Sequence, residues 1–401
     1  MIDLTEKELK KIRVFVTDGY WRKTVAAVRA LGRMGLRVTV SESTYLAPAL
    51  FSRYCYRRVR SPSPMLQPSR YLDFLEKYLH HHPHQVLMPM EEATLLLLAQ
   101  HRERFAGITR LPCASYDSLL FARDKLKVLR QAEALDIPTP KTYEITSIDQ
   151  IEPLTGQLQY PLVVKPRVGS GSAGMHYVSE PSQLSAALER VFLSGQLPLV
   201  QERLPADGAG IGASFLLDQE HQIRASFIHR RLREYPVEGG PSTLRESIIH
   251  DQVRHDGARL LQNLHLTGVA MVEFKIDSRD GKAKLLEVNP RFWGSLALAI
   301  NAGVNFPYLL TLMALEWDFP PVLDYSLGHF CRWLLPGDIL HFLKNPGRWQ
   351  LKPSFFQLRK PNLTYDIVDL KDPLPILGSV LALLPFYLSQ DFVHIRTRRR
   401  S

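Results

Sequence analysis

The sequence predicts an α/β fold at its start, with α+β character in its middle part. Three observations predict it: a strand–helix–strand opening, apolar runs of strand length that carry lysines and acids, and helical segments between them. The run 12–17 is a buried-strand pattern, and a helical segment follows from about Arg22 to Met34. Gly35 is placed to end that helix before a second strand at 37–40. This β-α-β unit predicts a parallel sheet with a right-handed crossover.

A further strand at 86–89 and a helix at 91–104 extend the opening unit into a small doubly wound domain. No G-x-G-x-x-G follows its first strand, which argues against dinucleotide binding there. The cluster His80–His84 is expected to be a loop that caps a helix end. Metal binding is the less favoured alternative, because the proline breaks the helical spacing of metal ligands and no acid or cysteine is adjacent. The expected organisation is a domain at 1–113, a domain at 114–320 that divides into 114–198 and 199–320, and a C-terminal extension at 321–401.

Composition narrows the class of protein. The net charge is +10, but the basic residues are dispersed and no basic segment with interleaved stacking aromatics stands out, so nucleic-acid binding is not expected. The three cysteines are widely spaced without a C-x-x-C pair, and the polar start, Met1 to Lys11, resembles neither a signal peptide nor an anchor. We therefore expect a reducing, cytoplasmic setting.

Two short strand-like segments that carry acids, at 272–274 and 285–291, are the most informative part of the chain. The polar stretch 277–282 between them contains Asp-Gly, a hairpin turn signal, so Glu273 and Glu287 are expected to lie opposite each other. Like charges in that position repel, and a divalent cation would remove the penalty. Asn289 shares a strand face with Glu287, and carboxylate with amide oxygens suits Mg²⁺. The alternative is a surface hairpin with exposed acids.

A glycine-rich stretch follows a strand that ends in Lys165. Gly169 to Gly174 fits G-x-G-x-x-G, but strand-like runs flank it on both sides, which predicts a hairpin loop rather than a strand-to-helix turn. Its backbone N–H groups are suited to closing over phosphates, with the lysine as a point charge. No Walker A ending and no kinase H-R-D or D-F-G set is present, and a plain surface hairpin is the alternative.

The order of these features resembles the ATP-grasp superfamily over about residues 12–315, and it is most similar to its carboxylate–amine ligases and carbamoyl-phosphate-synthase-like members. The resemblance implies a doubly wound pre-ATP-grasp domain, then an ATP-grasp fold that binds ATP and Mg²⁺, with Mn²⁺ as an alternative. The residues it implies for ATP are Lys125, Lys165, Gly169, Ser170, Gly171, Gly174, Gln201, Glu202 and Leu204. The metal ligands it implies are Glu273, Glu287 and Asn289, and Lys165 and Arg291 take catalytic roles.

The resemblance also implies a reaction, in which a carboxylate is activated as an acyl-phosphate and joined to an amine, with release of ADP and phosphate. A bicarbonate-using carboxylase or carbamoyl-phosphate-type enzyme is an alternative, and so is a non-catalytic nucleotide-binding protein. The expected partners are a small-molecule carboxylate and amine, and a homodimer stays open. Arg230 and Arg231 are candidates for clamping a substrate anion, unless they form a solvated face. Trp293 is a candidate for lining the acyl pocket, with core packing as its alternative.

The end of the chain is apolar and then basic. The segment 375–388 is too short for a spanning helix, which needs about 20 residues. A helix docked on the protein is the first interpretation. A peripheral membrane contact through 375–400, with the basic tail Arg396–Arg400 as anchor, is the second.

Overall fold

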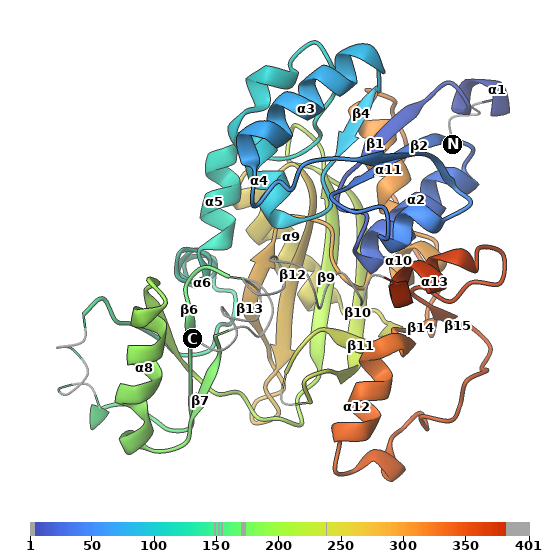
Figure 1. The fold of residues 1–401 in the computed structure, drawn as a ribbon. Coiled ribbons are helices and arrows are strands. Elements are labelled where there is room, and N and C mark those ends of the chain that lie inside the picture. Colours follow the sequence, from blue (N-terminus) through green and yellow to red (C-terminus); the bar gives the residue numbers. More distant parts are fainter. Residues whose placement is uncertain are drawn as a thin grey trace.

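Three β-sheets organise the protein, seen in a computed structural model that describes residues 5–381 apart from 148–149, 151–152, 154, 170–173 and 238. A four-stranded sheet lies near the N-terminus, a second four-stranded sheet follows, and a seven-stranded sheet forms the body of the molecule (Figure 1). The fold is that of the predicted α/β class with a parallel N-terminal sheet, which confirms the fold-class prediction.

The N-terminal sheet is parallel throughout, in the order β3-β2-β1-β4. The predicted β-α-β unit is present, and Gly35 ends its helix with φ +88°, a conformation that favours glycine. One strand and most of the helix after it were not predicted from the sequence, and the strand lies at the sheet edge with mostly exposed, basic side chains that do not alternate clearly. The elements are α1 (Glu6–Leu9), β1 (Arg13–Val16), α2 (Arg22–Arg33), β2 (Arg37–Glu42), β3 (Cys55–Arg60), α3 (Pro68–His81), β4 (Val86–Met88) and α4 (Glu92–Gln100).

The histidine cluster lies at the end of α3, as expected. His84 is buried, with Nε2 2.8 Å from Thr39 Oγ1. His82 stacks on Tyr78 at a ring-centroid distance of 4.5 Å. These rings therefore have packing partners within the N-terminal sheet.

The second sheet is antiparallel, in the order β5-β8-β6-β7. The run from Arg123 to Lys127 does not lie within one helix, because the structure breaks it at Asp124. The Asp124 carboxylate caps the second helix by accepting from two backbone N–H groups, which explains the break. The elements are α5 (Tyr116–Arg123), α6 (Lys125–Ala134), β5 (Thr142–Glu144), β6 (Leu162–Pro166), β7 (His176–Val178), α8 (Leu184–Leu193) and β8 (Pro198–Glu202).

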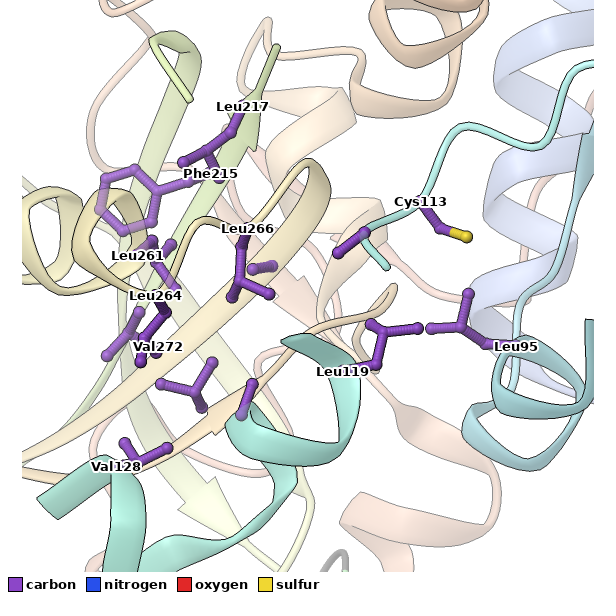
Figure 2. Packing of buried hydrophobic residues seen from close by; sticks show 14 of the residues in the cluster. Leu95, Cys113, Leu119, Val128, Phe215, Leu217, Leu261, Leu264, Leu266 and Val272 are labelled. Atoms are coloured by element: carbon purple, nitrogen blue, oxygen red, sulfur yellow. The ribbon is translucent and has the colours of Figure 1, made fainter. Parts of the chain in front are cut away.

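The seven-stranded sheet has the order β13-β12-β9-β10-β11-β14-β15 and is antiparallel except at its last pair. Leucines of α9 and of the turn after it pack on Phe215 and Val272 of the sheet, and α5 and α6 complete this core (Figure 2). The elements are β9 (Gly210–Leu217), β10 (Ile223–Glu234), β11 (Ser242–Ser247), α9 (Asp251–Asn263), β12 (Gly268–Ile276), β13 (Ala283–Asn289), α10 (Leu296–Asn301), α11 (Phe306–Ala314), β14 (Phe330–Arg332) and β15 (Leu363–Tyr365).

The C-terminal extension completes this sheet rather than standing apart from it. Besides supplying β14 and β15, it places three buried aspartates against buried arginines of earlier segments: Asp338 with Arg233, Asp366 with Arg245, and Asp372 with Arg29. The remaining elements are α12 (Ile339–Lys344) and α13 (Leu374–Leu381).

The described part of the apolar C-terminal segment is docked on the N-terminal region. Gly378 of α13 lies against Pro48 and Phe51, so close that an added Cβ would be 2.7 Å from the Phe51 ring. This agrees with the docked-helix interpretation as far as residue 381. The rest of 375–400, including the basic tail, lies outside the described residues. Within the described residues, no helix is long and apolar enough to cross a membrane.

Candidate active site

The hairpin β12–β13 brings two glutamates together, as the sequence predicts. Glu273 and Glu287 are direct partners in the ladder, next to an irregularity in the register. Asn289 lies on the same face, with Nδ2 3.4 Å from Glu273 Oε1 and 3.1 Å from Glu287 Oε1. The predicted register is therefore confirmed, and the hairpin carries a compact group of two carboxylates and one amide.

Cations from three other elements neutralise this acidic pair. Arg231 of β10 pairs with Glu273, and Lys125 Nζ at the start of α6 lies 3.5 Å from Glu287 Oε2. Burial raises the pKa of Glu273, and the neighbouring Glu287 adds to the rise against the attraction of Arg231. Burial also acts to raise the pKa of Glu287, but Lys125 and Lys165 outweigh it and lower that pKa. The pKa values of the two acids thus shift in opposite directions, and Glu287 loses its proton more readily than Glu273.

Lys165 is buried near the end of β6, and its Nζ donates to Gln201 Oε1 at 2.9 Å. Burial, reinforced by repulsion from Lys125, lowers the pKa of Lys165 to about 8. Lys125 Nζ donates to the carbonyl oxygen of Gly169 at 2.6 Å. The two lysines therefore lie between the acidic hairpin and the start of the glycine stretch.

The glycine stretch is described at both ends. Gly174 has φ +73°, and a Cβ there would lie 3.0 Å from Pro166 Cγ, so glycine suits the position on both counts. Ser170 and Gly171, expected to contact ATP, lie outside the described residues. The strands β6 and β7 on either side pair antiparallel, which confirms the predicted strand flanks.

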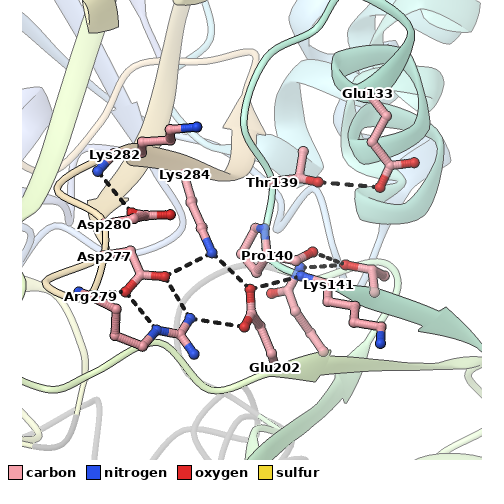
Figure 3. Close-up of polar contacts among 12 residues, drawn as sticks. Glu133, Thr139, Pro140, Lys141, Glu202, Asp277, Arg279, Asp280, Lys282 and Lys284 are labelled. Atoms are coloured by element: carbon pink, nitrogen blue, oxygen red, sulfur yellow. Dashed lines mark hydrogen bonds and ion pairs between the residues drawn. The ribbon is translucent and has the colours of Figure 1, made fainter. Parts of the chain in front are cut away.

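The three residues expected near adenine differ in how they are engaged. Gln201 is buried and bonds Lys165 and Thr142 through its side chain. The Glu202 carboxylate accepts from Arg279 at 2.9 Å and from Lys284 at 3.0 Å, within a group of ion pairs that joins β8 to the β12–β13 hairpin (Figure 3). The Leu204 side chain is buried. The side chains of Gln201 and Glu202 thus have protein partners, and the backbone N–H of Glu202 donates to the carbonyl oxygen of Lys141 at 2.9 Å.

Arg291 follows directly after the hairpin and is held from two sides. Its Nη2 donates to Asn289 Oδ1 at 3.0 Å, and its Nε lies 3.4 Å from Glu92 Oε2. Glu92, which also pairs with Arg123 at 2.6 Å, was not among the predicted site residues. A signal for it existed, because Glu91-Glu92 follows the predicted strand 86–89 at the carboxyl edge of a parallel sheet, where ligand sites of α/β folds gather.

Two of the candidate substrate residues need correction. Arg231 lies beside Glu273, but Arg230 points to the other face of β10, where it is 47% exposed and pairs with Glu246 at 2.7 Å. Alternation along a strand sends neighbouring side chains to opposite faces, so both arginines do not reach the same site. Trp293 is fully buried and packs edge-on against Phe306 at 5.0 Å. Its core-packing alternative is therefore the one that the structure supports.

The donor set of the hairpin fits a hard divalent cation. Two carboxylates and the amide oxygen of Asn289 supply the oxygen ligands that Mg²⁺ and Mn²⁺ prefer. The amide turns its nitrogen toward the acids and its oxygen toward Arg291, so a cation bound through that oxygen would require the amide to rotate and release Arg291. Among the described residues no group of three or more His, Cys, Asp and Glu side chains is placed to hold a metal ion, and in the hairpin group the third member is an asparagine.

Comparison with known proteins defines the class. Residues 122–295 match the model of the ATP-grasp domain family. A curated relative is the carbamoyl phosphate synthase large chain of Xylella fastidiosa, 26% identical over 56% of this chain and 22% of its own length. Another is the D-aspartate ligase of Enterococcus faecium, 23% identical over 61% of each chain. The chain thus spans about a fifth of the length of the first relative and less than two thirds of the second.

A solved structure shares the fold. The biotin carboxylase domain of Hydrogenobacter thermophilus 2-oxoglutarate carboxylase, crystallised with MgADP, ADP and bicarbonate, superposes with a TM-score of 0.66 at 12% identity, over 79% of this chain and 73% of that chain. Together with the family match, this likeness shows that the chain contains an ATP-grasp domain, as the predicted resemblance implied.

Proposed function

We propose that this protein is an ATP-dependent ligase that activates a carboxylate as an acyl-phosphate and joins it to an amine. The observation that carries the proposal is the convergence of Lys125 and Lys165 on the acidic group Glu273, Glu287 and Asn289 inside an ATP-grasp domain. The D-aspartate ligase relative supports the reaction type. The domain boundaries at 113 and 320 are part of the same proposal.

The roles of the side chains follow from charge. Bound ATP would supply the phosphoryl group, and Mg²⁺ or Mn²⁺ would supply positive charge that offsets the negative charge of its phosphates. Glu273, Glu287 and Asn289 would hold the metal, while Lys125 and Lys165 would hold the phosphates. Arg291, kept in place by Glu92, would lie against the transferred group and offset the repulsion between two anions.

The stretch between Gly169 and Gly174 would close over the nucleotide and exclude water, because an acyl-phosphate is hydrolysed readily. Arg231 is the remaining candidate for the acid substrate, since a substrate carboxylate near Glu273 would compete for its guanidinium. The reducing cytoplasm is the setting we propose, in keeping with three cysteines that form no disulfide.

The test is a screen of ADP release over pairs of amino acids and small carboxylates. ADP release should require both an acid and an amine, and hydroxylamine should trap the acyl-phosphate when the amine is left out. Lys165→Ala and Glu287→Ala should lower turnover by about 100-fold or more. The matched control is Glu246→Ala, which removes an acid on the outer face of the same sheet. Full turnover in the Lys165→Ala and Glu287→Ala variants would contradict the proposal.

A second candidate is a bicarbonate-using enzyme, which the carbamoyl phosphate synthase relative and the biotin carboxylase fold favour. The same screen separates it from the first. ADP release with bicarbonate as the only acid would support it. Tight ATP binding without any product would instead support a non-catalytic nucleotide-binding role.

A further inference from the structure

The segment 339–360, which we name the basic aromatic loop, has an unusual charge pattern. It runs through α12 and the short 3₁₀ turn Arg348–Gln350 to Lys360, between strands β14 and β15. It contains five Lys and Arg residues and no Asp or Glu. None of the five forms an ion pair with a described residue, whereas most arginines in the neighbouring sheet are paired. The loop therefore presents uncompensated positive charge to its surroundings.

Four aromatic rings of the same loop stack on one another outside the protein core. Phe342 stacks on Phe355 at a centroid distance of 4.3 Å, and Trp349 stacks on Phe356 at 6.0 Å with an interplanar angle of 19°. None of the four belongs to the three hydrophobic clusters of the described chain. Trp349 is 72% exposed and Phe356 is 61% exposed. Removing such rings from water normally stabilises a fold, so the exposure of Trp349 and Phe356 requires another explanation.

Aliphatic side chains extend the same surface. Leu343 is 58% exposed and Leu358 is 49% exposed, and both lie in the basic aromatic loop with the exposed Lys344 and Lys352. A surface that mixes exposed Trp, Phe and Leu with Lys and Arg has the composition of elements that lie in the boundary of a bilayer. The rings enter the headgroup region, while the lysines reach the phosphates.

The loop also lies away from the active-site hairpin. β13 and β15 are opposite edges of the seven-stranded sheet, and the loop connects β14 to β15. Figure 1 shows α12 and the chain after it extending beyond the end of the sheet, on the side opposite β6 and β7. Docking through this loop would therefore leave the acidic residues of the β12–β13 hairpin free.

We propose that the basic aromatic loop docks the protein on an anionic phospholipid surface. Charge complementarity selects an anionic partner, because the loop has no acid of its own. The exposed leucines favour a lipid over a nucleic acid, since base stacking uses aromatic rings and has no need of aliphatic side chains. This site is separate from the C-terminal tail and goes beyond the proposed ligase reaction.

The test is co-sedimentation of the full chain with vesicles of phosphatidylcholine, with or without roughly a third phosphatidylglycerol. Binding should require the anionic lipid and weaken as salt is raised. Trp349→Ala with Phe356→Ala should weaken binding at least tenfold, and Lys344→Gln with Lys352→Gln should weaken it about thirtyfold. Leu193→Ala, at a site 87% exposed on α8, is the matched control and should bind as the parent does.

A spectroscopic readout places the contact within the loop. Tryptophan emission should shift to the blue on vesicles, and the shift should disappear in Trp349→Phe but persist in Trp21→Phe, which removes a tryptophan that is 42% exposed on the N-terminal region. Both variants keep an aromatic ring, so folding and binding should be retained.

Several results would overturn the proposal. One is unchanged vesicle binding in the loop variants. Another is loss of binding only when Arg396, Arg398, Arg399 and Arg400 of the tail are changed to glutamine. The third is absence of vesicle binding together with binding of a single-stranded RNA oligonucleotide that the loop variants weaken, because that result would assign the surface to nucleic acid.

Discussion

The lowered pKa of Lys165 makes nucleotide binding depend on pH in a range where few other side chains titrate. Its ammonium has a pKa of about 8, which burial and the nearby Lys125 depress from 10.5. If the charged form is the one that holds phosphate, the binding-competent fraction is about 90% at pH 7 and about 10% at pH 9. The affinity for ADP should therefore fall about tenfold between these two pH values. Binding falls because the free protein must first take up a proton.

Calorimetric titration of ADP at pH 7 and pH 9, at constant ionic strength and Mg²⁺, measures this loss directly. Lys165→Arg supplies the matched variant, because a guanidinium stays charged across the whole range. Its ADP affinity should be the same at both pH values, whatever its absolute strength. The reasoning is wrong if Lys165→Arg shows the same tenfold loss as the parent.

Three further predictions concern single acids. Asp338→Asn leaves two buried arginines without a charged partner and should lower the free energy of unfolding by about 3–5 kcal/mol, against under about 1 kcal/mol for the surface pair in Glu246→Gln, both measured by denaturant unfolding. Equal losses would contradict the burial argument. Glu287→Gln should raise the Mg²⁺ concentration for half-maximal ADP release at least tenfold, and an unchanged metal titration would remove this residue from the metal site. Glu92→Gln should lower kcat about tenfold while ADP affinity stays constant, because Glu92 acts by positioning Arg291, and a matching loss of ADP affinity would argue against that role.

The sequence predicted those features that depend on local alternation and turn chemistry. A strand repeats every two residues, so the acids of 272–274 and 285–289 have defined faces once the Asp-Gly turn sets the register. The structure pairs Glu273 with Glu287 as that argument required. The same alternation, applied strictly to β10, separates Arg230 from Arg231, so only one of these two candidates can face the acidic hairpin.

Features that depend on distant segments could not be found in this way. Arg245 meets Asp366 across 121 positions of sequence, and Arg29 meets Asp372 across 343. No local pattern in 321–372 states that β14 and β15 continue the sheet from β11, because strand pairing at that separation is decided by tertiary packing. The basic aromatic loop escaped notice for a related reason. Its four rings are spread from Phe342 to Phe356, and only the fold stacks them.

The electrostatics of the active site explain why so many charges are buried close together. Keeping Lys165 charged in its buried position at neutral pH disfavours the folded state by about 3 kcal/mol, the equivalent of lowering its pKa from 10.5 to about 8. The cost is present in full below pH 8 and disappears as pH rises toward 10.5, because the unfolded chain then loses its own proton. Burying the negative charge of Glu273 also disfavours the folded state, because burial and the neighbouring Glu287 raise the pKa of its carboxyl group. A polyphosphate beside the lysine and a divalent cation beside the acids would each relieve one of these costs. Ligands of opposite charge would therefore offset the free energy that burying these charges costs the folded protein.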